Sequence, residues 1–125
     1  MAPEILINIK KRLSGDKKIS TMLIIPADSS WTVIFGSSGA GKSTILRTLA
    51  GLDRSDKGLI KFGGETWEDT ENEIFIPPQE RPVGLLFQDF ALFPHMTVEN
   101  NIIYNLPVPK EEKLKRFREL VSLFN

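Results

Sequence analysis

The chain has 125 residues, in which 16 Lys and Arg balance 16 Asp and Glu, with 41% hydrophobic residues and no cysteine. This composition indicates one folded domain and excludes collagen-like and disordered classes, disulfide frameworks and thiol chemistry. A net charge of zero gives no general attraction to nucleic acid, and no apolar run approaches the roughly 20 residues of a membrane span, so we expect neither a nucleic-acid partner nor a membrane-crossing segment.

The first part of the chain predicts a hairpin, a buried strand and a helix. Isoleucines alternate with other residues over 5–9, and a polar turn separates them from a second apolar strand over 19–25, which predicts antiparallel pairing. The β-branched run 31–35 is typical of a central strand buried on both faces. Apolar residues at helical spacing over 42–50 predict a short helix that ends at Gly51.

The second part predicts shorter strands and two helices. Residues 58–62, 73–76 and 83–87 have strand patterns, and the acidic stretch 65–73 predicts a solvated loop. Thr97 is the expected cap of a helix, and another begins near Lys110. The inward residues that we expect in these helices are Val98, Ile102, Ile103, Leu106, Leu114, Phe117, Val121 and Phe124.

The last apolar stripe has no stop signal before the final residue, so we expect the chain to be part of a longer protein. The order of elements predicts a mixed α/β domain. It would have a parallel core around the segment 36–43 and a small antiparallel region at the amino end.

The segment 36–43 matches the phosphate-loop pattern G-x-x-x-x-G-K-[ST] at Gly36, Gly41, Lys42 and Ser43. A predicted strand precedes it and a predicted helix follows, which is the context that gives the pattern its meaning. Backbone N–H groups at a helix amino end can converge on a polyphosphate, provided that bulky side chains do not block the approach. The residues we expect to surround the phosphates are Gly36, Ser37, Ser38, Gly39, Ala40, Gly41, Lys42, Ser43 and Thr44.

Three side chains of this segment have separate expected roles. The ammonium of Lys42 should contact the β- and γ-phosphates, and the Ser43 hydroxyl should be a ligand of Mg²⁺. Thr44 can add a hydroxyl beside the α-phosphate. The predicted cofactors are therefore ATP and Mg²⁺.

The phosphate loop continues into residues 45–52, and later residues 81–88 and 89–102 follow; together these stretches resemble the ABC transporter ATPase family. The resemblance implies a P-loop NTPase fold and covers the whole chain, but only the amino-terminal part of the family's nucleotide-binding domain. Gln88 matches the Q-loop glutamine, which in the family ligates Mg²⁺ and responds to the membrane-spanning partner. The resemblance also implies catalytic roles for Lys42 and Gln88, and metal ligation by Ser43 and Gln88.

The stretch 89–102 is similar to bacterial importers, and residues 76–81 and 38–42 are most similar to the molybdate, tungstate and sulfate branch. The resemblance implies an ATPase subunit that couples ATP hydrolysis to uptake of a small solute such as molybdate. Its partners would be a transmembrane permease subunit and a second copy of the ATPase in a homodimer. Its place would be the cytoplasmic face of the membrane, as a peripheral subunit.

Departures from the family limit what the chain should do alone. The signature helix, Walker B aspartate, catalytic glutamate and switch histidine of the family have no counterpart here, so we expect nucleotide binding without hydrolysis. Residues 1–30 contain no aromatic side chain to stack on adenine, and Leu13 stands near that place, so most affinity should come from the phosphates.

Two alternatives remain open on the sequence. One is a soluble ABC-type ATPase of DNA repair or chromosome maintenance, and the other is a non-hydrolysing nucleotide-binding module that self-associates. Trp31 and Trp67 are expected to be structural rather than base-stacking. His95 has no partner at metal-ligand spacing, and the cluster Phe90, Leu92 and Phe93 predicts core packing or a groove for a membrane subunit.

Overall fold

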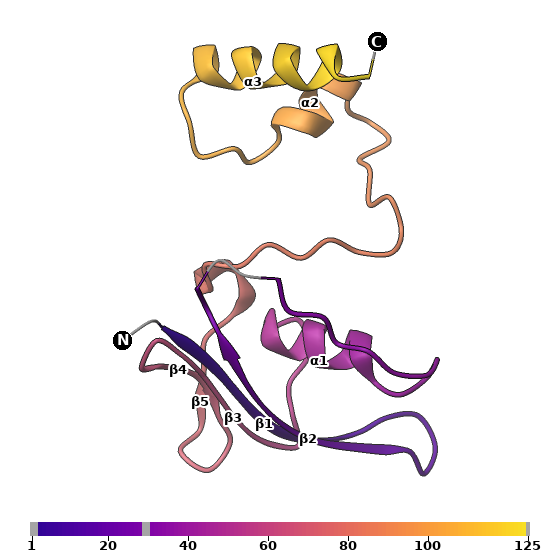
Figure 1. The fold of residues 1–125 in the computed structure, drawn as a ribbon, viewed down its shortest axis with the longest axis vertical. Coiled ribbons are helices and arrows are strands. Elements are labelled where there is room, and N and C mark those ends of the chain that lie inside the picture. Colours follow the sequence, from indigo (N-terminus) through magenta and orange to yellow (C-terminus); the bar gives the residue numbers. More distant parts are fainter. Residues whose placement is uncertain (1–2, 29–30, 125) are drawn as a thin grey trace. The chain divides into compact units, whose positions relative to one another are not determined.

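The computed structural model describes residues 3–28 and 31–124. The chain divides into two compact units, Met1–Leu86 and Phe87–Asn125, which are described separately below (Figure 1). No helix in the described part of the chain is long and apolar enough to cross a bilayer.

The first unit is built on a sheet of order β2-β1-β3-β4-β5 in which every pairing is antiparallel. Strands β1 (Glu4–Arg12) and β2 (Lys18–Pro26) form the predicted hairpin, with Ile7 opposite Leu23. Strand β3 (Lys57–Phe62) pairs with the other edge of β1, and Ile7 faces Ile60. The alternation of isoleucines along β1 thus forms one face of a sheet, as predicted.

The prediction of a solvated loop over 65–73 is wrong for residues 65–69, whereas residues 71–73 form an exposed turn. Residues Glu65–Asp69 form strand β4, which pairs with β3 and with the short strand β5 (Ile74–Phe75). Gly63 and Gly64 have positive φ values of 55° and 92°, a backbone conformation that favours glycine, and turn the chain back between β3 and β4. Trp67 and Glu68 are each 1% exposed despite the acidic composition around them, and Trp67 packs in the core of this unit.

Helix α1 (Lys42–Leu49) covers the apolar face of this sheet and forms where the sequence predicts a helix. The buried residues of the resulting core are Ile7, Ile9, Ile19, Ile45, Ile60 and Trp67. Ala50 ends the helix, and Gly51 follows with a φ of 79°, as expected for a left-handed carboxyl-terminal cap. The helix that follows the phosphate loop is therefore held directly against the sheet.

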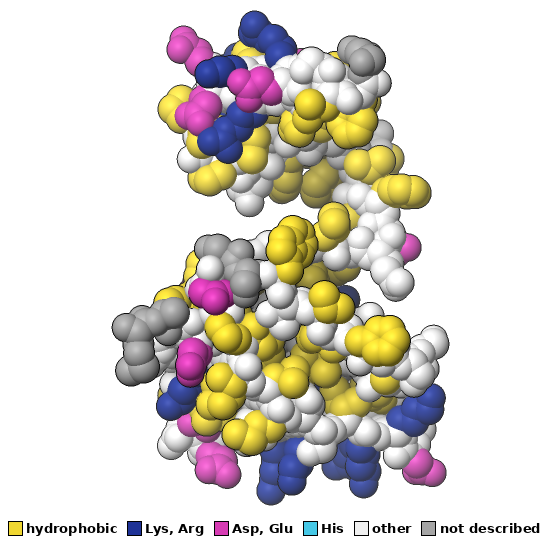
Figure 2. Space-filling view, viewed as in Figure 1, with side chains coloured by type: hydrophobic (Ala, Val, Ile, Leu, Met, Phe, Trp, Pro, Cys, Tyr) yellow, Lys and Arg dark blue, Asp and Glu magenta, His cyan; other side chains and the backbone are white. Residues whose placement is uncertain are grey.

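Two predicted strands, 31–35 and 83–87, are not formed within residues 31–124, and the expected parallel core is absent from the described part of the chain. Trp31 and Phe35 are each 97% exposed, so the expectation that Trp31 points into a core is also wrong. A strand exists only where a neighbour pairs with its backbone N–H and C=O groups. Neither segment has such a neighbour among the described strands, although both have strand composition. Apolar side chains accordingly lie at the surface of this unit (Figure 2).

The second unit contains helices α2 (Val98–Ile103) and α3 (Lys110–Ser122), near the places that the sequence predicts. Thr97 caps α2, because its hydroxyl accepts a hydrogen bond from the Asn100 backbone N–H at 3.1 Å. Most of the expected inward residues are half-buried, but Val98, Val121 and Phe124 are exposed, the first and last by 72% and 87%, so these three are not core residues. Two short helices that pack on each other share too small a contact surface to bury every apolar side chain of both helices.

Asn101 organises the turn before α2 within the second unit. Its Oδ1 accepts from the Phe93 N–H at 2.8 Å, while its Nδ2 donates to the carbonyls of Phe93, Met96 and Thr97 at 3.1, 3.2 and 2.9 Å. One side chain therefore contacts four backbone groups of this turn, of which the carbonyls of Phe93 and Thr97 also accept backbone N–H groups.

We expect Asn101→Ala to loosen this turn, because each of those backbone groups loses a hydrogen bond that contributes about 1 kcal/mol. Faster amide exchange at Phe93, measured by NMR, would report the change. Asn100→Ala is the matched control, since Asn100 is exposed and only its backbone N–H takes part in the cap. Unchanged exchange at Phe93 in Asn101→Ala would contradict the assigned role.

Candidate functional site

The phosphate loop is a tight turn that leads directly into helix α1. The Ala40 N–H donates to the Ser37 carbonyl at 3.1 Å, and Gly39 and Gly41 have φ values of 78° and 98°. These left-handed values disfavour side chains, which explains the glycines at both positions. Gly41 is also the N-cap of α1, and no side chain caps the helix there. The amino end of α1 thus keeps its N–H groups and positive dipole end available to an anion.

Lys42 folds back over this loop. Its ammonium donates to the carbonyls of Gly36 and Ser37, each at 2.7 Å. These two hydrogen bonds hold the positive charge of Lys42 beside the first residues of the loop, where the motif has small side chains. Ser43 is exposed and Thr44 half-buried, so the Ser43 hydroxyl is accessible to a ligand. This set of cation, amides and hydroxyls fits a polyphosphate with its Mg²⁺.

The β1–β2 hairpin lies against the same loop. A Cβ atom built on Gly41 would lie 2.5 Å from Cγ2 of Ile19, so the backbone of the loop touches the buried start of β2. A Cβ atom built on Gly39 would lie 3.6 Å from Nζ of Lys17. The hairpin therefore supports the loop with an apolar side chain and places an ammonium group beside it.

The far end of α1 is held by Arg81, which is 4% exposed. Its Nη1 donates to the carbonyls of Thr48 and Leu49 at 2.9 and 2.7 Å, and its Nε donates to the Ile76 carbonyl at 2.8 Å. A guanidinium at a helix carboxyl end pairs with carbonyls that the helix leaves unpaired and complements the dipole. Arg81 thus ties α1 to the segment that follows β5.

The surroundings of Arg81 are aromatic and acidic. Its guanidinium carbon lies 5.6 Å from the ring centre of Trp67 and 5.2 Å from that of Phe75. Burial lowers the pKa of Arg81 from its ordinary value, and the nearby carboxylate of Glu68 opposes that shift. Glu68 Oε1 accepts from the N–H and hydroxyl of Ser55, each at 2.8 Å, so the buried carboxylate is itself partly satisfied.

Gln88, the other predicted site residue, lies near the start of the second unit and is exposed. The residues 36–44 belong to the first unit and are gathered in one loop and helix end, as predicted. Joint ligation of Mg²⁺ by Ser43 and Gln88 therefore stays a prediction.

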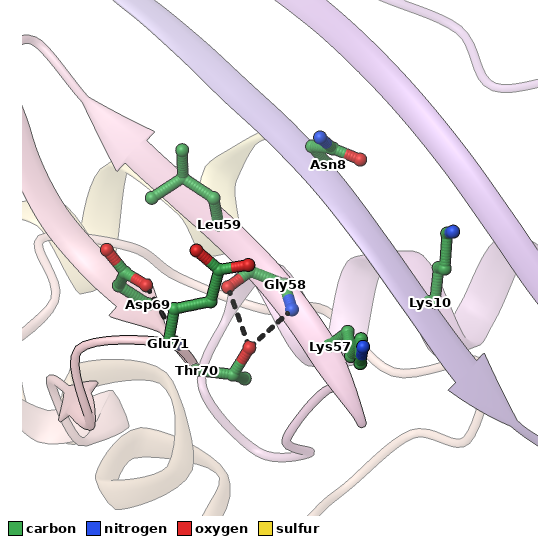
Figure 3. A pocket seen from close by; sticks show the side chains of 8 residues that line it. All are labelled: Asn8, Lys10, Lys57, Gly58, Leu59, Asp69, Thr70 and Glu71. Atoms are coloured by element: carbon green, nitrogen blue, oxygen red, sulfur yellow. Dashed lines mark hydrogen bonds between the residues drawn. The ribbon is translucent and has the colours of Figure 1, made fainter.

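A polar hollow of about 420 Å³ lies elsewhere on the first unit (Figure 3). Strands β1, β3 and β4 and the residues after β4 line it with Asn8, Lys10, Lys57, Gly58, Leu59, Asp69, Thr70 and Glu71. Asn8 and Lys10 alternate with the buried Ile7 and Ile9, so the hollow is on the solvent face of the sheet, away from α1. It includes no residue of the phosphate loop.

Sequence reasoning found the phosphate loop but missed its supports. In the sequence analysis Arg81 is only part of a family-like stretch, and Lys17 has no role. The one available signal for Arg81 was a charged residue directly before an apolar run, which many exposed residues share. Trp67 was expected to be structural, and its burial in the core confirms this, although in a strand rather than a loop.

Comparison with known proteins identifies the family of the chain. Residues 25–125 match the family model described as ABC transporter. The chain is 36% identical to the trehalose/maltose import ATP-binding protein of Thermococcus litoralis, over 98% of this chain and 34% of that protein. It is 38% identical to the molybdenum import ATP-binding protein of Photobacterium profundum, over 94% of this chain and 31% of that protein.

A third relative, the sn-glycerol-3-phosphate import ATP-binding protein of Paracoccus denitrificans, is 37% identical over 90% of this chain and 30% of its own length. The chain thus spans about a third of the length of these curated relatives. The phosphate loop and helix α1 lie inside the matched residues, and the match covers most of the chain. The chain belongs to the ABC transporter family.

Proposed function

We propose that the chain binds Mg-ATP through residues 36–44 as part of the ATP-binding subunit of an ABC importer. The observation that carries the proposal is the uncapped amino end of α1, with two left-handed glycines before it and the Lys42 ammonium over the loop. Together these groups supply converging donors and a positive charge where a polyphosphate needs them. The ATP-binding proteins named above, each an import protein, support the transport role.

In this proposal Lys42 holds the β- and γ-phosphates and Ser43 ligates Mg²⁺, with Gln88 as a further ligand. Thr44 is half-buried in the first turn of α1, and its proposed role is a hydroxyl contact on the α-phosphate side. Bound Mg²⁺ supplies neutralisation of the phosphate charge. The chain's own residues orient the phosphates and hold them against the helix end.

The proposal extends to partners and place. The subunit would work as a homodimer on a transmembrane permease subunit, at the cytoplasmic face of the membrane. A small oxyanion such as molybdate is the proposed solute, supported by the similarity to molybdenum import proteins at 38% identity. The 125 residues contain no counterpart of the family's signature helix or catalytic glutamate, so we propose that the whole protein hydrolyses ATP while this chain alone only binds it.

Calorimetric titration of Mg-ATP into the chain tests the proposal. We expect Lys42→Ala to weaken binding by about a hundredfold, because a charge-assisted contact to phosphate is lost. Lys61→Ala, on strand β3, is the matched control and should bind like the unmodified chain. Circular dichroism should show all three chains equally folded, and phosphate release in the same samples should stay at background. Equal binding by Lys42→Ala, or no binding by the folded unmodified chain, would contradict the proposal.

A further inference from the structure

We propose that Lys17 is a second cationic contact for the nucleotide phosphates, supplied to the loop by the β1–β2 hairpin. This inference rests on the proposed nucleotide binding and adds a residue that lies outside the phosphate-loop motif. The central observation is the position of the Lys17 ammonium, whose Nζ is 3.6 Å from where a Cβ of Gly39 would lie.

The backbone of the hairpin sets this position. The Leu13 N–H donates to the Lys17 carbonyl at 2.8 Å, which closes the turn at the end of β1, and Gly15 within it has a φ of 69°. A closed turn of this kind fixes where the next residues leave the hairpin. Lys17 is therefore held at a defined end of the sheet.

A separate contact shows that the hairpin itself lies beside the loop. Ile19, two positions further along, has its Cγ2 at 2.5 Å from a Cβ built on Gly41. Lys17 lies just before β2, which begins at Lys18, so the two contacts join the loop to the end of the turn and to the start of the strand. The position of Lys17 in the hairpin therefore places it beside the loop.

The charge of Lys17 is available to a ligand. Lys17 is exposed, and no ion pair or hydrogen bond holds its ammonium within residues 3–28 and 31–124. Figure 2 shows both basic and acidic side chains at the end of the first unit that carries the β1–β2 turn. The Lys17 ammonium itself would attract an anion toward the loop.

The hairpin offers this charge in place of an aromatic ring. Residues 1–30 contain no Phe, Tyr or Trp, and Leu13 packs against the core of the first unit. Stacking on the base is therefore unavailable from the hairpin, whereas an ammonium beside Gly39 can contact an oxygen of the phosphate chain. Polyphosphate, rather than the nucleobase, is the ligand class that this arrangement favours.

The test compares Lys17→Met with Lys18→Met by calorimetry at low and high salt, using Mg-ATP and inorganic tripolyphosphate as probes. The two variants remove the same charge from adjacent exposed residues, but Lys18 points to the opposite face. We expect Lys17→Met to lower the affinity for both probes by about tenfold at low salt. Lys18→Met should change these affinities by less than about twofold. Added salt should reduce the difference in affinity between the two variants, because it screens the charge of Lys17. Lys17→Arg keeps the charge and should retain most of the affinity of the unmodified chain.

Each outcome decides the assignment. Equal affinities for Lys17→Met and Lys18→Met, in a chain that binds Mg-ATP and loses it in Lys42→Ala, would overturn the role of Lys17 alone. A loss seen with Mg-ATP but not with tripolyphosphate would place Lys17 on the base or ribose and overturn the polyphosphate assignment. No binding of either probe by the folded unmodified chain would overturn the proposed function and this inference together.

Discussion

Arg81→Met is expected to lower the free energy of unfolding of the chain by about 3 kcal/mol or more. The substitution removes a donor from each of the carbonyls of Thr48, Leu49 and Ile76. The Thr48 carbonyl still accepts from the Gly51 N–H at 3.1 Å, so the loss falls mainly on the other two. It also removes a positive charge that interacts with the buried carboxylate of Glu68, and a buried carboxylate is costly without such a charge. Methionine fills similar volume, so a cavity should add little to the loss.

Arg47→Met is the matched control for this prediction. Arg47 lies on the same helix and pairs with Asp53 through Nε and Oδ2 at 3.1 Å, but its side chain is 44% exposed. Solvent screens such a pair, so its loss should change stability much less. Urea unfolding followed by the fluorescence of the buried Trp67 measures both variants. Equal unfolding midpoints for the two would show that the contacts of Arg81 are not a main support of α1.

Gly41→Ala is expected to destabilise the chain by about 3 kcal/mol and to abolish measurable nucleotide binding. Gly41 has a φ of 98°, where an alanine costs about 1–2 kcal/mol, and the new methyl group would meet Ile19 Cγ2 at 2.5 Å. The contact is with a buried side chain of the core, which cannot move aside freely. The loop must then shift away from the hairpin, and the amide groups of α1 lose their arrangement.

Gly64→Ala separates the two causes. Gly64 has a similar φ of 92°, but a Cβ built there has no atom within 4 Å. This variant should therefore show the backbone cost alone, about 1 kcal/mol, with nucleotide binding unchanged. Urea midpoints and calorimetric titration with Mg-ATP give both readouts. A Gly41→Ala chain that binds Mg-ATP like Gly64→Ala would contradict the close packing of loop and hairpin.

Local patterns in the sequence were sufficient for the hairpin, the helices and the phosphate loop. The alternation of Ile5, Ile7 and Ile9 predicts β1, and the spacing from Gly36 to Ser43 predicts the loop before α1. Thr97 was predicted as a helix cap for the same kind of reason, because a cap depends on atoms only a few residues away.

The same reasoning was wrong at two places where pairing between strands decides the outcome. The acidic composition around Trp67 predicted a loop, yet β3 and β5 on either side make it strand β4. The composition of 31–35 predicted a buried strand, yet among the described residues no segment pairs with it and its side chains are exposed. Strand composition states a preference, and a neighbouring strand is needed to satisfy the backbone.

By itself, then, the sequence determined the phosphate-loop motif and the helix that follows it, because the glycines, the lysine and the helix start are neighbours in the chain. Only the tertiary structure decided what holds that loop in place. Arg81 donates to carbonyls that lie 33 and 32 positions earlier in the chain. Lys17 and Ile19, in the hairpin, lie beside Gly39 and Gly41 of the loop. Such contacts depend on how the sheet and the helix pack against each other. Residues that are remote in the chain can be buried together or hydrogen-bonded at any sequence separation, so no sequence pattern predicts these contacts.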